Sequence, residues 1–144
     1  MIPPFTADGN LPPGIHAATL DEVEARFAWN RRRVRLTAGL RAAARALTSA
    51  GCKRLYVDGS FVTTKEFPED FDGCWEVAGV DLAKLDPILK IFAARRLAQK
   101  MKYRGELFPN TPSVPADAAG TLYLEFFQAD KSTGKAKGIV AIDL

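Results

Sequence analysis

A glycine-serine turn in the middle of the chain separates two segments that favour β-structure, and this arrangement constrains the fold most. Residues 53–58 read Lys-Arg-Leu-Tyr-Val-Asp, an alternating pattern rich in β-formers, which predicts a strand that ends at Gly59-Ser60. A second strand is predicted over 70–77, after a short linker that contains Pro68. We therefore expect a sheet built around this turn.

Helical patterns precede and follow the two strands. Thr19 followed by Glu22 forms a capping box, and Gly51 supplies a stop signal, so a helix is predicted over about 20–50. The apolar phase is interrupted at Asn30–Arg33, which predicts a bend or break near Asn30. Apolar residues at helical spacing predict a second helix over 82–102.

The remaining sequence predicts three further strands. They cover 103–108, 122–128 and 138–144, with a loop at 110–120 and a turn at 131–137 between them. Antiparallel pairing of the last two, as a C-terminal hairpin, is the simplest arrangement. The order of elements predicts an α+β fold, with one mixed β-sheet flanked by helices.

Length and composition favour one domain. With 144 residues, 47% of them hydrophobic, the chain can bury a core without a disulfide or metal. Residues 1–18 contain Pro3, Pro4, Pro12 and Pro13, so they predict an extended N-terminal arm before a single domain over 19–144.

Charge and cysteine content restrict the cellular compartment and the partners that we expect for the protein. Cys52, Cys74 and the single His16 offer no zinc ligand set and favour a reducing compartment. No apolar run is long enough to span a membrane, and the N-terminus lacks a signal-peptide pattern. We therefore expect a cytoplasmic protein without a membrane partner, and the net charge of +3 is too small to indicate nucleic-acid binding.

Asp70 and Asp72 are the strongest candidates for chemistry. Residues two apart on a strand point to the same face, so these carboxylates lie together while Phe71 and Trp75 face the core. Paired carboxylates repel each other, and a bound Mg²⁺, which prefers hard oxygen ligands, would relieve that cost. Gly59 would let the backbone approach a phosphate closely, and Ser60 adds hydroxyl and amide donors.

Together, Gly59-Ser60 and Asp70-Phe71-Asp72 resemble the signature of the DNA polymerase β-like nucleotidyltransferase superfamily. The order strand, turn, strand, helix, strand is also similar to the core of that family. The likeness extends over most of the chain from Thr19 onward, and it is closest to small, stand-alone bacterial nucleotidyltransferase-like proteins. It implies a nucleotidyltransferase-like core in which Asp70 and Asp72 are catalytic metal ligands.

The resemblance also implies a third carboxylate on the strand after the long helix. Glu106 is the first choice, as third ligand or as the base that takes the acceptor proton, and Glu125 in the next segment is its competitor. Lys65 would lie near the phosphates of a nucleoside triphosphate bound at Gly59 and Ser60.

The implied activity is Mg²⁺-dependent transfer of a nucleoside monophosphate to a hydroxyl of a protein or an RNA. Because small members of the superfamily act as antitoxins that modify a toxin, a toxin is one implied partner. A rival interpretation is an inactive binding or regulatory module, since Asp58 and Gly73 stand where the family carries apolar residues. The arginines between 26 and 45 are expected to form a solvated helix face or, in a second rival, an RNA-contacting one.

Overall fold

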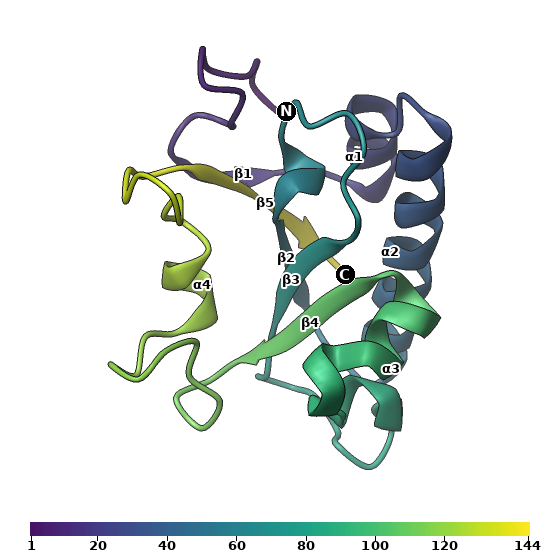
Figure 1. The fold of residues 1–144 in the computed structure, drawn as a ribbon. Coiled ribbons are helices and arrows are strands. Elements are labelled where there is room, and N and C mark those ends of the chain that lie inside the picture. Colours follow the sequence, from purple (N-terminus) through teal and green to yellow (C-terminus); the bar gives the residue numbers. More distant parts are fainter.

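The computed structural model describes all 144 residues and contains one five-stranded mixed sheet (Figure 1). The order across the sheet is β1-β5-β2-β3-β4. Strand β2 is antiparallel to β3 and β5, whereas β4 is parallel to β3 and β1 is parallel to β5. The strands are β1 (Gly14–Ala17), β2 (Arg54–Asp58), β3 (Phe71–Glu76), β4 (Gly105–Asn110) and β5 (Gly138–Asp143).

Helices cover one face of the sheet more fully than the other. In Figure 1, α1 (Leu20–Phe27), α2 (Arg31–Ser49) and α3 (Ala93–Tyr103) lie on one side, and α4 (Tyr123–Phe126) lies on the other. Two short 3₁₀ helices, η1 (Ser60–Val62) and η2 (Pro87–Lys90), complete the elements. The α+β class and the mixed sheet are therefore as predicted, and no helix is both long and apolar enough to cross a membrane.

Each face of the sheet has its own apolar cluster. The larger one packs residues such as Val57, Phe71 and Trp75 of the sheet against the helices α1 and α2. The smaller one lies on the opposite face, where Tyr56, Cys74 and Phe108 pack with Phe127, one residue beyond α4. The alternation along β3 thus separates Phe71 and Trp75 from the face that carries Asp72, as the sequence predicts.

The predicted break in the first helix is confirmed. Thr19 and Glu22 form the capping box of α1, and Asn30 begins α2 by accepting a hydrogen bond from the backbone amide of Arg33. Gly51, just beyond the helix, has φ +94°, a conformation that residues with a side chain rarely adopt.

The helix predicted over 82–102 is shorter than expected. Residues before Asp86 form turns, and Pro87 begins η2 with the Asp86 carboxylate accepting from the amide of Ile88. Within α3, Ala94–Arg96 have left-handed backbone angles, so regular helix begins only after them. The apolar spacing identified the buried Leu85 and Leu89, but it was wrong for the second half of the segment, where Leu97 and Met101 are exposed. It also did not reveal the interruptions.

The strand predicted over 122–128 and the C-terminal hairpin are wrong. Residues Tyr123–Phe126 form α4, and β5 pairs with β1 and β2. Tyr123 and Phe127 are four residues apart, so a helical turn brings both rings toward Phe108, with the Tyr123 and Phe108 centroids 4.1 Å apart. A short apolar run fits either period, and here packing against the sheet favours the helix.

Candidate active site

Acidic residues from three neighbouring strands, β2, β3 and β4, line up at one end of the sheet. Asp72 of β3 is paired in register with Asp58 of β2 on one side and with Glu106 of β4 on the other. Directly opposed residues on adjacent strands project from the same face, so the carboxyl groups form a row across the sheet. Asp70, the residue before β3, has the same parity as Asp72 and joins them.

Asp70, Asp72 and Glu106 form a compact group, termed here the acidic cluster. One carboxylate oxygen from each residue lies within 4.8 Å of the others, and all three residues are half-buried. At that separation and an effective dielectric constant near 20, each pair of ionised groups repels by about 3–4 kcal/mol. The arrangement is therefore suited to a divalent cation held by hard oxygen ligands.

Cations from α3 partly offset this negative charge. Arg96 Nη2 lies 2.6 Å from Glu106 Oε1, and Lys100 Nζ lies 3.4 Å from the same oxygen. Burial alone would raise the pKa of Glu106, but its hydrogen bond with Arg96, together with the nearby positive charges, lowers that pKa below the ordinary value. Glu106 is thus held as a carboxylate.

The pKa values of Asp70 and Asp72 shift upward, opposite to that of Glu106. Burial raises the pKa of Asp72, and the neighbouring carboxyl groups of Glu106 and Asp70 add to that shift. Burial and the charge of Glu106 likewise raise the pKa of Asp70. Without a cation the cluster therefore retains a proton at pH values where an exposed aspartate would be ionised.

Asp58 is separated from the acidic cluster by its own ion pair. Its carboxylate is 2.8 Å from Lys137 Nζ, and both side chains are largely buried. Burial raises the pKa of Asp58, and Lys137 acts against that shift. Asp58, which stands where an apolar residue is usual in the nucleotidyltransferase signature, is thereby accommodated as a structural charge.

The predicted glycine-serine turn lies directly beside the acidic cluster. Gly59 has φ +85°, and a Cβ at this position would be only 2.8 Å from Asp72 Oδ2 and 3.2 Å from the Asp72 amide nitrogen. A side chain is therefore excluded here for both conformational and steric reasons. Ser60 begins η1 immediately after the turn and is partly exposed.

A buried arginine that the sequence analysis missed fastens this turn to α2. Arg33 is fully buried, and its guanidinium donates to the carbonyl oxygens of Phe61 (2.6 Å), Thr63 (2.8 Å) and Lys65 (3.2 Å). The sequence predicts Arg33 on a solvated or RNA-contacting helix face, and its burial shows that both predictions are wrong for this residue. Its spacing was the available signal, because Arg33 lies three residues before Leu36 on the buried stripe of α2.

The other predicted residues lie outside this group. Lys65 is exposed, and its backbone carbonyl, rather than its ammonium, makes the contact with Arg33. Glu125 is exposed on α4. The structure thus brings Asp70, Asp72, Glu106 and Gly59 together and does not bring Lys65 or Glu125 into the acidic cluster.

The neighbouring thiol is not poised for nucleophilic chemistry. Cys74 is fully buried, and burial raises its pKa well above the ordinary value, so the reactive thiolate is disfavoured. Cys52 is also a buried free thiol, so the two cysteines do not pair. The carboxylates remain the reactive groups of this face.

Comparison with known proteins places the chain in a family without adding an activity. No curated protein and no solved structure matches it significantly. A family described as of unknown function, DUF6932, matches residues 3–143, nearly the whole chain, and the protein belongs to that family.

Proposed function

We propose that this protein is a Mg²⁺-dependent nucleotidyltransferase that moves a nucleoside monophosphate from a nucleoside triphosphate to a hydroxyl group of a protein or an RNA. The observation that carries the proposal is the position of the acidic cluster directly beside the Gly59-Ser60 turn. Neither feature alone would support it, because glycine-serine turns and acidic pairs are both common on protein surfaces.

The residues of the cluster fit a magnesium ion. Carboxylate oxygens are the donors that Mg²⁺ prefers, and a site built from one or two carboxylates plus substrate phosphates is typical of this ion. Asp70 and Asp72 would hold it, with Glu106 as the third ligand. When bound, the ion would neutralise charge on the phosphates and on the leaving pyrophosphate.

The protein groups would supply position and proton transfer. Gly59 keeps the backbone clear of Asp72, and the hydroxyl and amide of Ser60 would donate to the triphosphate. The acceptor hydroxyl would attack the α-phosphorus, the bond to the β-phosphate bridging oxygen would break, and pyrophosphate would leave. Where Glu106 acts as the base instead of as the third ligand, the hydroxyl proton would pass to its carboxylate, which the lowered pKa keeps ionised.

The arginines of α2 help to choose between an RNA and a protein as the acceptor. Arg32 and Arg35 line a shallow hollow with Arg104 and with Glu69, the residue before Asp70. A polyanion held in this hollow would lie against Glu69, one residue before Asp70, which favours an RNA end as acceptor. A toxin protein, the partner that the family resemblance implies, is the other acceptor to test.

The decisive experiment measures pyrophosphate release. The protein would be incubated with Mg²⁺ and each labelled triphosphate, with RNA or with the product of the neighbouring gene as acceptor. We expect label transfer and stoichiometric pyrophosphate, both lost in Asp70→Asn and Asp72→Asn. Glu125→Gln is the matched control, because it removes an exposed carboxylate outside both the acidic cluster and the arginine-lined hollow, and it should retain activity.

A catalytically silent module with the same binding site is the second candidate. The observations that favour it are the buried Asp58–Lys137 pair and the capture of Glu106 by Arg96 and Lys100. Calorimetric titration separates the two candidates: saturable triphosphate binding that needs Mg²⁺, with no pyrophosphate release for any acceptor, identifies the silent module. Absence of both binding and release removes both candidates.

A further inference from the structure

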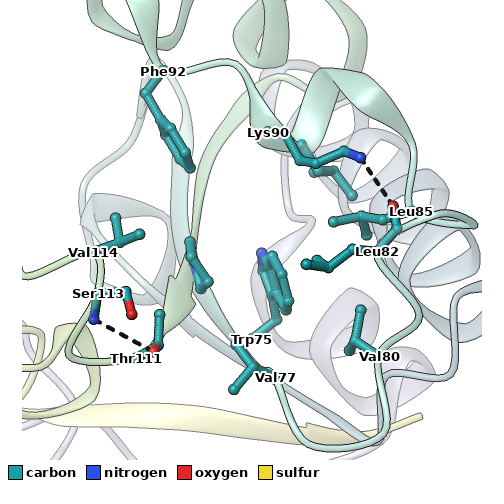
Figure 2. Close-up of a pocket in the computed structure, with 12 residues that line it drawn as sticks. Trp75, Val77, Val80, Leu82, Leu85, Lys90, Phe92, Thr111, Ser113 and Val114 are labelled. Carbon is teal, nitrogen blue, oxygen red and sulfur yellow. Dashed lines mark hydrogen bonds between the residues drawn. The ribbon is translucent and has the colours of Figure 1, made fainter.

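A pocket at the far end of the sheet from the acidic cluster carries features of a second binding site. It lies between the segments that follow β3 and β4, with Trp75 between them (Figure 2). We name it the Trp75 pocket. Its other lining residues include Leu85, Lys90, Phe92 and Val114. Trp75 and the acidic cluster lie on opposite faces of the sheet.

The size and lining of the pocket fit a small organic molecule. Its volume is about 420 Å³, and eight of the twelve lining residues are hydrophobic. Small-molecule sites typically span roughly 300–1,000 Å³ and combine apolar walls with a few polar groups that fix orientation. The charged group that lines this pocket is Lys90, and no acidic residue lines it.

Trp75 supplies an unsatisfied donor in this apolar setting. The residue is 2% exposed, and its indole Nε1 is the one buried side-chain nitrogen or oxygen that finds no hydrogen-bond partner. A buried polar group without a partner costs about 1–3 kcal/mol, so such groups are rare and need an explanation. In Figure 2 the indole nitrogen is turned toward the side of the pocket where Lys90 and Phe92 lie.

Lys90 adds positive charge at the mouth of the same pocket. Its ammonium donates one hydrogen bond to the carbonyl of Leu82, at 2.9 Å, as the dashed line in Figure 2 shows. It takes part in no salt bridge, so further donors of the ammonium are free to receive an anion.

We propose that the Trp75 pocket binds a small apolar carboxylic acid. The carboxylate would accept a hydrogen bond from the Lys90 ammonium, which supplies a counter-charge, and one from Trp75 Nε1, which a small shift of the lining side chains would open to the pocket. The hydrocarbon body would lie against Leu85, Phe92 and Val114. This site does not depend on the proposed nucleotidyltransferase activity, because neither Mg²⁺ nor nucleotide takes part.

The test observes the Trp75 indole directly. The chain has two tryptophans, so ¹⁵N-labelled protein gives two indole N–H signals, which Trp29→Phe assigns. Trp29 is half-exposed against Arg33, away from the pocket, and serves as an internal reference. The protein would be titrated with octanoate and with 2-naphthoate, one linear and one aromatic acid, without Mg²⁺ or nucleotide. We expect a saturable shift of the Trp75 signal alone with at least one acid.

Matched probes and variants identify the head group and the site. Octylamine should leave the signal unchanged, and Lys90→Met should weaken binding of the acid by about threefold to fivefold, the worth of a partly exposed charge pair. Lys84→Met, an exposed lysine outside the pocket, should have no effect. Trp75→Phe should abolish binding.

Three results would overturn the proposal. They are a Trp75 signal that neither acid moves saturably, octylamine binding as tightly as octanoate, and equal effects of Lys84→Met and Lys90→Met. Because Lys90 is exposed and its replacement leaves the core intact, the lysine comparison stays informative even if Trp75→Phe fails to fold.

Discussion

Asp72 is the residue on which the candidate active site is centred. It is flanked in register by Asp58 and Glu106, faces Asp70, and contacts the backbone of Gly59 closely enough to exclude a side chain there. Its pKa is raised to about 8 by burial and by the neighbouring carboxyl groups. Asp86, which is less buried and pairs with Lys102, has the opposite shift, because its hydrogen bonds with Lys102 and Tyr103 lower its pKa.

The raised pKa predicts how stability changes with pH. The unfolded value lies near 3.9, so between about pH 4 and pH 8 the unfolded chain releases this proton while the folded chain keeps it. Stability of the metal-free protein should therefore fall as pH rises through this window. The opposite shift of Glu106 limits the loss, because its contribution is present above its unfolded pKa and is lost only as pH falls through the lowered one.

Asp72→Asn should remove the loss of stability that the metal-free protein undergoes as pH rises. We expect the metal-free variant to be more stable than wild type at pH 8, by up to about 5 kcal/mol for a pKa raised by about four units, and equal to it near pH 4. Mg²⁺ should raise the wild-type midpoint and leave that of the variant unchanged, since a ligand stabilises only the state that binds it. Melts with EDTA and with excess Mg²⁺ give the comparison, and Glu125→Gln, at an exposed position on α4, is the control.

The contrary outcome is equally clear for Asp72. If the variant melts several degrees below wild type in EDTA, and Mg²⁺ changes the melting midpoint of neither protein, the aspartates hold the fold together and do not bind a metal.

Parity on a strand was enough to predict that Asp70 and Asp72 share a face. It could not predict the proton that they retain, which depends on Glu106, Arg96 and burial, all supplied by other elements.

At the scale of elements, the segment from Gly59 to Lys65 depends on α2. Arg33 binds carbonyl oxygens of this segment and also that of Phe27 at the end of α1, at 3.1 Å. Helix α2 thus fixes the connection that leads from the glycine-serine turn to the strand carrying Asp72. The contact explains how an irregular segment can hold a precise turn beside the acidic cluster.

Arg33→Met should loosen this connection. It leaves several buried carbonyls without a donor, so we expect a loss of about 3–5 kcal/mol in the free energy of unfolding. Arg33→Lys should lose less, because one ammonium replaces part of the donor set. Denaturant melts measure the cost, and the exposed Arg32→Met and Arg35→Met should stay within about 0.5 kcal/mol of wild type.

The same series separates a local effect from a general one. Hydrogen exchange of the amides in 60–65 should increase more in Arg33→Lys than exchange in β5, which lies away from this contact. Equal costs for replacing Arg33 and Arg32 would show that burial of Arg33 is energetically unimportant.

Elements differ in how far the sequence could predict them, and the reason is the range of the interactions involved. The capping box at Thr19 and the strand at 54–58 depend on local patterns, and both are confirmed. Residues 122–128 carry too short an apolar run to distinguish a strand from a helix, and the stack of Tyr123 on Phe108 decides for the helix. That ring partner lies on a different element, so no local pattern contains it.

At the scale of the whole molecule, the two ends of the chain are joined in the sheet. Figure 1 shows β1 beside β5, and the pairing is parallel, with Gly14 opposite Gly138 and Ala17 opposite Ala141. The arm was predicted to lie extended over the surface, but its place as an edge strand was not predicted. Such a pairing between distant segments leaves no periodic trace in either of them.

Gly138 is the position where this closure is tightest. Its amide donates to the carbonyl of Leu11, a residue that is 1% exposed. A Cβ at Gly138 would lie 2.0 Å from the carbonyl oxygen of Pro12 and 2.8 Å from His16 Nε2, distances that no side chain can occupy. Backbone atoms cannot rotate away as a side chain can, so relief requires the arm to move.

Gly138→Ala should therefore detach the N-terminal arm from the sheet. We expect a loss of at least about 2 kcal/mol in the free energy of unfolding, from the buried contacts of Leu11 and the β1 hydrogen bonds, and faster proteolysis within residues 1–18. Gly134→Ala is the control, because its backbone is left-handed, with φ +71°, but a Cβ there meets nothing, so it should cost only about 1 kcal/mol and leave the arm protected. Limited proteolysis followed by mass spectrometry locates the cuts. If both variants are cleaved at the wild-type rate, the arm is held by contacts other than those around Gly138, and the tight fit at this position does not keep β1 in the sheet.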